Sequence, residues 1–160
     1  KLFIQVLYST GNDGTSASDS GEFRTIAQSV RDNSGSQGYW SFLGLTSPRG
    51  PSDVVDLGVG LQNRGLGLRT IQAALERKIF EDLSAYVATG YLRSDEENPV
   101  NADKDMGVEL LGEIHWTFKK AMGLDLGASY LVTGGFYKTG PNVPDPDDLY
   151  QIYLRYQLEF

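Results

Sequence analysis

Apolar and polar residues alternate with a period of two along much of the second half of the chain. In MGLDLGASYLVT (122–133) every even-numbered residue is apolar, and the odd-numbered positions open with Gly, Asp, Gly and Ser. MGVELLGEIHWTF (106–118) alternates in the same way. This period gives a β-strand one apolar and one polar face. Alternation over about 11 residues is longer than a typical globular strand and matches a tilted strand that crosses a bilayer.

Four further segments carry strand signals. LSAYVATGYLRS (83–94), QIYLRYQLEF (151–160) and LFIQVLY (2–8) alternate with an apolar face. RTIQAALERKI (69–79) fits either a strand or an amphipathic helix, because good helix formers separate its apolar positions. We predict a strand there, since the neighbouring strands need a partner.

The region 10–68 allows two interpretations. It is either one long loop or a loop with two more strands, at 22–30 and 38–46. The first interpretation gives six strands in the chain. The second gives eight, the smallest common barrel.

Short and long connections alternate between the predicted strands. Residues 80–82 and 119–121 form tight turns, whereas 94–105 and 134–148 are long, polar and rich in Gly, Pro and Asp. Hairpins folded about these connections pair 75 with 87, 115 with 125, 87 with 112, and 130 with 152. Every apolar face then lies on one side of an antiparallel up-and-down sheet, whereas a one-residue slip would reverse a face.

The 160-residue length predicts a single domain, residues 1–160. The 19 Gly, 9 Tyr and 7 Phe suit all-β structure with turns, and the absence of Cys excludes disulfides and thiolate metal sites. The formal net charge of −7 argues against nucleic acid as a partner. No apolar run reaches 18 residues, so the sequence predicts no transmembrane helix. Lys1 leads directly into the first strand, so we expect a mature chain or a piece of a larger one.

Periodicity alone does not separate a soluble sandwich, whose apolar face is the core, from a membrane barrel, whose apolar face contacts lipid. Three features favour the barrel: the apolar faces are long and uninterrupted, the polar face mixes charge with Gly, and aromatic residues gather near strand ends. The predicted interfacial girdle consists of Tyr91, Trp116, Phe118, Tyr130, Tyr150 and Phe160.

The final strand carries apolar residues at every second position and ends on Phe160. It resembles the assembly signal of Gram-negative outer-membrane β-barrels. LYSTGNDG (7–14) and LERKIFEDLSAYVATGYLRSDEE (75–97) look like the C-terminal part of porins and alginate-export-like channels. The resemblance implies a transmembrane β-barrel in the bacterial outer membrane, whose last strand, 151–160, is recognised by the barrel-assembly machinery and pairs with the first strand. It also implies lipid, lipopolysaccharide and small solutes as partners.

The polar face would line the lumen. Its candidate constriction residues are Glu109, Glu113, His115, Asp125 and Arg155. The predicted register sets His115 opposite Asp125, and it aligns Glu113, Gly127 and Arg155 so that the glycine lets the carboxylate reach the arginine. These groups form either a charged constriction that selects solutes or ion pairs that fill a narrow barrel.

His115 and Asp125 are two members of a hydrolase triad, but a nucleophile has to lie beside its base. Ser129 and Thr117 share the lumen face without pairing directly with His115, and Ser84 lies on the neighbouring strand. We therefore predict that the protein is not an enzyme. The single His also predicts no zinc site, and no motif indicates a cofactor.

Acidic residues gather in both long loops, 94–105 and 134–148. They either bind divalent cations that bridge lipopolysaccharide phosphates or keep exposed loops soluble, and the PDPDD spacing does not match an EF-hand loop. Arg64 and Arg69 lie near the predicted outer rim, where they could contact anionic lipid or solute.

The pattern therefore predicts a porin-like channel in which Glu109, Glu113, Asp125 and Arg155 set the charge preference of passive diffusion. One alternative is a small closed eight-stranded barrel with a structural or adhesive role through its loops. Another is a soluble β-sandwich or lipocalin-like binding barrel. Detergent dependence separates the soluble alternative from the others, and a conductance step separates the channel from the closed barrel.

Overall fold

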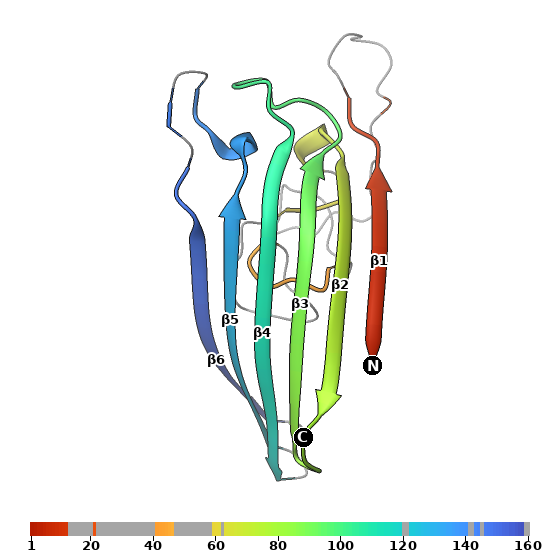
Figure 1. The fold of residues 1–160 in the computed structure, drawn as a ribbon, viewed down its shortest axis with the longest axis vertical. Helices are drawn as coiled ribbons and strands as arrows, with labels where there is room; N and C mark the ends of the chain where they lie inside the picture. The colour runs from red at the N-terminus through yellow and green to blue at the C-terminus, as the bar shows by residue number, and fades with distance from the viewer. Residues whose placement is uncertain are drawn as a thin grey trace.

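The computed structural model describes residues 1–12, 21, 41–46, 59–61, 63–119, 122–140, 143–144 and 146–158. These residues form one all-β sheet of six antiparallel strands that follow one another up and down in chain order (Figure 1). The strands are β1 (Leu2–Ser9), β2 (Leu68–Lys78), β3 (Leu83–Ser94), β4 (Asp105–Lys119), β5 (Met122–Thr133) and β6 (Leu149–Leu158). Two short 3₁₀ turns, η1 (Asn63–Gly65) and η2 (Gly135–Tyr137), precede β2 and follow β5. The predicted antiparallel up-and-down order is confirmed.

The sheet is not closed. β1 and β6 lie at opposite edges. The resemblance had implied that the first strand pairs with the last, and within the described residues it does not. The candidate strand 22–30 and Phe160 lie outside the described residues. Of the candidate strand 38–46, the described part, 41–46, consists of bends and is not a strand.

The ambiguous segment 69–79 is a strand as far as residue 78. β2 pairs with β1 on one side and with β3 on the other. Partners on both sides override the helix propensity of residues such as Ala74 and Leu75. Ile71 and Leu75 thereby share a face with Val6 and Val87, their neighbours across the strands.

Three of the four predicted cross-strand pairs are observed: Leu75 with Val87, Val87 with Gly112, and His115 with Asp125. The fourth prediction is wrong by two residues, because Tyr130 pairs with Tyr150 and not with Ile152. A shift of two residues keeps every side chain on its predicted face but changes its partner across the strands. The long connection before β6 does not fix a register as a tight turn does.

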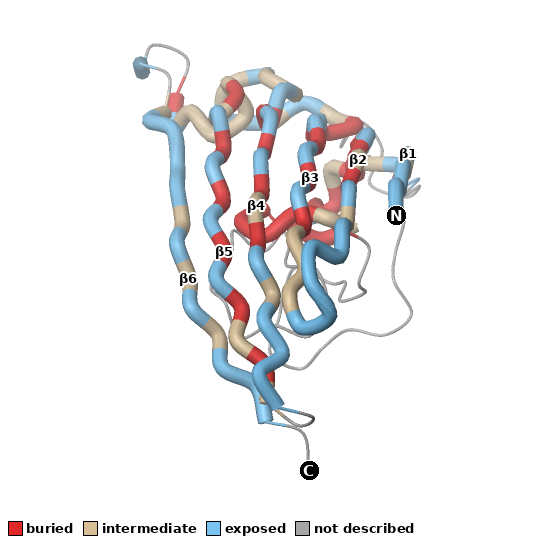
Figure 2. Tube along the Cα trace, turned by 60° about the horizontal axis from the view of Figure 1, so that its bottom comes forward, coloured by how far each residue is buried: buried red, intermediate tan, exposed pale blue. Residues whose placement is uncertain are grey.

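The two faces of the sheet differ in composition and exposure, and buried and exposed residues alternate along β3, β4 and β5 (Figure 2). The outer face carries the even-numbered residues of β1, β5 and β6, those of β4 from Val108 onward, and the odd-numbered residues of β2 and β3. It exposes large apolar side chains on every strand, among them Leu2, Ile4, Val6, Ile71, Leu75, Val87, Leu110, Ile114, Leu126, Ile152 and Leu154. Its charged residues lie at strand ends, with Arg69 and Arg93 near the long loops and Arg77 near the short turns.

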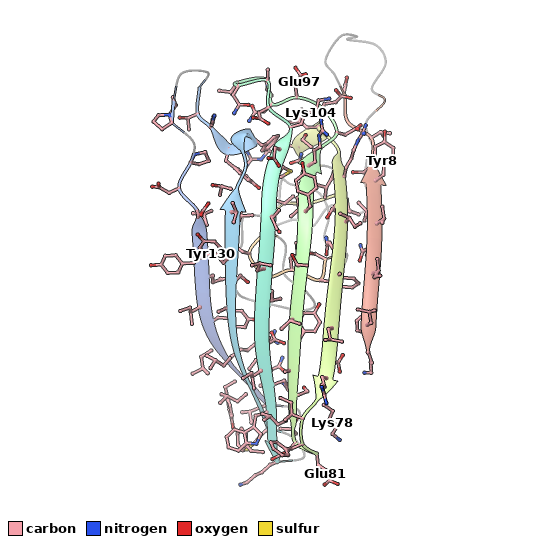
Figure 3. The ribbon with its side chains drawn as sticks, viewed as in Figure 1. Tyr8, Lys78, Glu81, Glu97, Lys104 and Tyr130 are labelled. Carbon is pink, nitrogen blue, oxygen red and sulfur yellow. The ribbon has the colours of Figure 1, made fainter. Side chains whose placement is uncertain are left out.

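Other charged side chains follow the same division between the two ends of the sheet. Glu97 and Lys104 lie at the long-loop end, and Lys78 and Glu81 lie at the short-turn end (Figure 3). The middle of the outer face is therefore an apolar band that spans all six strands.

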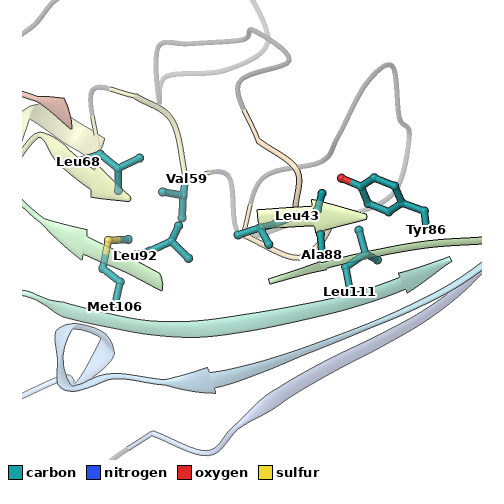
Figure 4. Packing of buried hydrophobic residues seen from close by; sticks show 9 residues of the cluster. Leu43, Val59, Leu68, Tyr86, Ala88, Leu92, Met106 and Leu111 are labelled. Carbon is teal, nitrogen blue, oxygen red and sulfur yellow. The ribbon is translucent and has the colours of Figure 1, made fainter. Parts of the chain in front are cut away.

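On the opposite, inner face, residues of the described segments 41–46 and 59–61 pack against the sheet (Figure 4). A buried cluster joins Leu43 and Val59 from these segments to residues of β2, β3 and β4, namely Leu68, Ala74, Tyr86, Ala88, Leu92, Met106 and Leu111. Burial of these side chains stabilises the two segments on the sheet. Within the described ranges, no helix has the length and hydropathy needed to cross a membrane.

Candidate functional site

Three cross-strand rows of mostly polar residues lie on the inner face. The register aligns Gln72, Gly90 and Glu109 in the first row, Glu113, Gly127 and Tyr153 in the second, and His115, Asp125 and Arg155 in the third. A glycine separates two polar side chains in each of the first two rows. A strand glycine lets another group approach the sheet closely, and the two gaps are filled in different ways.

Glu109 binds the backbone of segment 41–46, which crosses the first row. The N–H groups of Gly44 and Leu45 donate to Oε1 at 2.9 and 2.6 Å. Thr46 donates to Oε2 from its N–H at 2.8 Å and from its hydroxyl at 2.5 Å. The Glu109 side chain is fully buried, with 0% of its surface exposed. Four donors thus replace the water that a carboxylate loses on burial.

Gln72 binds the other end of the same segment. Its Oε1 accepts the N–H of Phe42 at 2.7 Å and the Ser41 hydroxyl at 3.4 Å. The Tyr86 hydroxyl, on β3, donates to the carbonyl of Phe42 at 3.0 Å. Three strands therefore fix segment 41–46 across the inner face, because Gln72, Tyr86 and Glu109 belong to β2, β3 and β4.

Gly90 makes room for this crossing. A Cβ at position 90 would lie 2.9 Å from Leu43 Cδ1 and 2.9 Å from Gln72 Cγ. Leu43 is fully buried in the space that the glycine leaves. The first row thus combines two hydrogen-bonding side chains with a gap between them that fits one leucine.

In the second row, the glycine leaves space for a side chain of the next strand. The ring of Tyr153 lies over Gly127, where a Cβ would collide with it, and its hydroxyl donates to Glu113 Oε2 at 2.5 Å. The prediction that Arg155 reaches Glu113 across Gly127 is wrong. The two-residue difference in the β5–β6 register places Tyr153 opposite the glycine instead.

Asp125 is the centre of the third row. Its Oδ2 accepts Arg155 Nε at 2.7 Å and lies 2.6 Å from Arg155 Nη2, a two-point guanidinium–carboxylate contact. Its Oδ1 contacts Nδ1 of His115, which confirms the predicted pairing of these two residues. The carboxylate is buried, with 1% of its surface exposed, so its partners replace its hydration.

His115 has a second neighbour on its own strand. Its Nε2 lies 3.0 Å from the Thr117 hydroxyl, so a hydroxyl does lie beside this imidazole, unlike the sequence prediction. Arg155 occupies the second oxygen of Asp125, which makes that carboxylate a structural ion-pair partner. Ser129, the other lumen-face hydroxyl considered, is buried next to Gly44 of segment 41–46. A Cβ built on Gly44 would lie 2.8 Å from the Ser129 Oγ.

Solvent access divides the predicted constriction residues. Glu109, Glu113 and Asp125 are buried, whereas the side chains of His115 and Arg155 are 40% and 22% exposed. A pocket of about 440 Å³ opens beside His115 at the short-turn end, lined also by Lys78 and Thr117. Among the described side chains, no group of three or more His, Asp or Glu could hold a metal ion.

The turn η2 packs against this site from the long-loop end. Phe136 and Tyr137 pack against the buried cluster, and their rings meet edge to face with centroids 5.5 Å apart. Burial, and then the charge of Glu109, raise the pKa of the Tyr137 hydroxyl above its usual value. This hydroxyl therefore stays neutral and adds no negative charge near Glu109.

Five of the six predicted girdle residues lie on the outer face and are exposed: Tyr91, Trp116, Phe118, Tyr130 and Tyr150. Trp116 Nε1 donates to Asp82 at 3.0 Å in the short turn, and the Tyr130 hydroxyl donates to Asp148 at 2.6 Å before β6. These two aromatic side chains thus direct a polar atom toward a strand end. This orientation suits a boundary between an apolar and an aqueous phase.

A further aromatic cluster occupies the short-turn end of the outer face. The rings of Trp116 and Phe118 have centroids 5.3 Å apart, and Phe118 stacks on Tyr156 at 6.0 Å. Tyr156 was not among the predicted girdle residues. Its place on the even-numbered face of the last strand was nevertheless readable from the alternation.

Asp95, just after β3, holds the long-loop end together. It accepts the N–H of Gly11 at 3.0 Å and Arg69 Nε at 2.6 Å, and its carbonyl accepts Lys104 Nζ at 2.7 Å. Burial acts to raise the pKa of the Asp95 carboxyl, but the Gly11 N–H and the hydrogen bond and charge of Arg69 outweigh it. The pKa is therefore lowered, and the carboxylate is the stable form.

Comparison with protein-family models, curated proteins and solved structures finds no match to this chain. The likeness to outer-membrane channels therefore stays a prediction from the sequence. The structural evidence on function is the contrast between the two faces of the sheet.

Sequence reasoning missed three parts of the site: segment 41–46, Gln72 as its partner, and Tyr153 over Gly127. The donors of segment 41–46 are mostly backbone N–H groups, which any sequence carries, so they leave no signature. The usable signal was Gly90, since a glycine in the middle of a long strand marks a close approach.

Proposed function

We propose that the chain forms part of the wall of an outer-membrane β-barrel, and that small polar solutes diffuse through its lumen past segment 41–46. One observation carries the proposal: the middle of the outer face is apolar and exposed, while the carboxylates of the inner face are buried and satisfied. A protein in water has the opposite arrangement, with the apolar face covered. Lipid around the wall and polar groups inside it explain both faces together.

The dimensions of the sheet agree with this proposal. The strands β2 to β6 have 10 to 15 residues, and a tilted strand needs about 9–11 residues to span a bilayer. Charged side chains lie at both ends of the apolar band, and Trp116 and Tyr130 turn their polar atoms toward those ends. Interfacial aromatic residues behave in this way in membrane proteins.

The inner-face residues fall into two groups, those that hold segment 41–46 and those that keep exposed surface. Glu109 and Gln72 hold segment 41–46 against the wall, which narrows the lumen, so their role is to position the segment. Arg155 and His115 keep exposed surface and would meet a passing solute.

A second candidate is a closed barrel with a filled interior and a structural role. The buried cluster around Leu43 and Met106 favours it, because a lumen packed with apolar side chains passes few ions. The two candidates share the lipid-facing wall and differ only in whether water crosses it.

The test is to purify the protein in detergent and reconstitute it in a planar bilayer. Discrete conductance steps that grow when Glu109→Ala releases segment 41–46 would support the channel. Stable insertion without conductance, in both the parent protein and the variant, would support the filled barrel. A protein that stays monomeric in buffer without detergent or lipid would overturn both.

A further inference from the structure

Two arginines face each other on the outer face at its long-loop end. Arg69 of β2 and Arg93 of β3 are direct partners in the register, and both are exposed. Like charges directly opposite one another in a sheet are destabilising unless an anion lies close by. The surroundings of the two guanidinium groups therefore indicate what this position accommodates.

Asp95 binds only one of the two arginines. It accepts Arg69 Nε and also contacts Arg69 Nη2, while the guanidinium lies 5.0 Å from the ring centre of Tyr8. Arg69 still keeps 57% of its side chain exposed. A guanidinium has five N–H donors, so this group retains donors for a further anion.

The side chain of Arg93 makes no hydrogen bond or ion pair with any other residue in the part of the chain that the structure describes. Asp105, its partner in the register on β4, instead accepts the N–H of Gly107 at 3.1 Å. No hydrogen bond or ion pair within the described part of the chain therefore has to break for this side chain to bind an anion. It lies beside the remaining donors of Arg69.

A pocket of about 450 Å³ joins these guanidinium groups to the apolar band. Its lining includes Val6, Tyr8, Ile71 and Tyr91 as well as the two arginines. An apolar groove that ends at two adjacent guanidinium groups matches a lipid with an anionic headgroup. Guanidinium groups bind phosphate with two parallel hydrogen bonds, a geometry that lysine does not offer.

We propose that this pocket binds one phosphorylated glycolipid of the lipid A class. Its phosphate lies between Arg69 and Arg93, and one acyl chain lies along Val6 and Ile71. The inference rests on the proposed function, because the long loops of an outer-membrane barrel lie on the outside of the cell and its short turns in the periplasm. That orientation places the pocket in the outer leaflet, which selects a glycolipid over an inner-leaflet phospholipid.

The test compares lipid binding by the delipidated protein in detergent, measured by native mass spectrometry. The probes are bis-phosphorylated lipid A, the same lipid after removal of its phosphates, and phosphatidylglycerol. We expect one tightly bound lipid A per chain and about tenfold weaker binding by Arg93→Gln, since a hydrogen bond between charged groups is lost. Arg77→Gln is the matched control, because Arg77 is an exposed outer-face arginine at the opposite end of β2.

Equal binding of lipid A by the parent protein and Arg93→Gln would overturn the proposal. Undiminished binding of the dephosphorylated lipid, or equally tight binding of phosphatidylglycerol, would also overturn it. Failure of the proposed function is recognised separately, because the protein would then remain monomeric in buffer without detergent. A protein that inserts into bilayers but ignores lipid A would refute this pocket alone.

Discussion

Glu109 and Asp125 are both buried carboxylates on the inner face, and they are satisfied in different ways. Glu109 accepts hydrogen bonds from Gly44, Leu45 and Thr46, three of them from backbone N–H groups. Asp125 binds the side chains of His115 and Arg155 on the two adjacent strands. One carboxylate therefore holds a distant chain segment, and the other holds neighbouring strands together.

The difference separates what local pattern encodes from what it does not. The ligands of Asp125 lie directly opposite it in the sheet, so strand alternation and register bring them together. The ligands of Glu109 are more than 60 residues away in the chain. Their position depends on how a non-strand segment folds back onto the sheet. Four substitutions or conditions test this comparison.

Glu109→Ala should have the largest effect. It leaves four buried donors without an acceptor, and each costs about 1–3 kcal/mol. Release and hydration of segment 41–46 recover part of this, so we expect a loss of roughly 3–5 kcal/mol in urea unfolding. Chymotrypsin should also cleave faster after Phe42. Glu97→Ala, in an exposed loop position, is the control; equal protease resistance in both variants would refute the clamp.

Arg155→Gln should cost less, about 3 kcal/mol, because Asp125 stays buried but keeps His115. The loss should appear in urea unfolding without faster cleavage at Phe42, since this row does not hold segment 41–46. Combining it with Asp125→Asn should recover part of the loss, because the uncompensated charge is gone. Strictly additive losses in the double variant would contradict a direct pair.

Gly127→Ala should destabilise the protein by about 1–3 kcal/mol, since the new methyl group displaces the Tyr153 ring and its bond to Glu113. Gly112→Ala is the matched control on the adjacent strand, because nothing lies within 4 Å of a Cβ built there. The comparison is by thermal unfolding in detergent. A loss in Gly112→Ala as large as that in Gly127→Ala would show that strand glycines matter only for backbone conformation.

Acid should weaken the long-loop end by the smallest amount. The folded pKa of Asp95 is lowered, so its contribution is complete above the unfolded value of about 3.9 and is lost as pH falls through the folded pKa. Thermal unfolding of the parent protein should therefore decline below about pH 4 more steeply than that of Asp95→Asn. Parallel pH profiles for the two proteins would remove Asp95 as the acid-sensitive group.

Much of the sheet could be predicted from the sequence. Alternation identified five of the six strands, β2 was assigned because its neighbours needed a partner, and the tight turn at 80–82 fixed the pairing of Leu75 with Val87. The connection 134–148 fixed only which face each residue of β6 occupies, so the partner of Arg155 was predicted as Glu113 instead of Asp125. The fold of segment 41–46 could not be predicted, because hydrogen bonds from backbone N–H groups carry no side-chain pattern.

The attachment of segment 41–46 through its backbone has an evolutionary consequence. The hydrogen bonds to Glu109 and Gln72 use no side-chain atoms of Phe42 or Leu45, so a substitution at either position alters packing without removing an anchoring hydrogen bond. Leu43, Gly44 and Thr46 are more closely restricted, by the gap over Gly90, by Ser129 and by the hydroxyl bond to Glu109, respectively. New linings can therefore be grafted or selected from loop libraries on an unchanged scaffold, provided that each keeps the same backbone path.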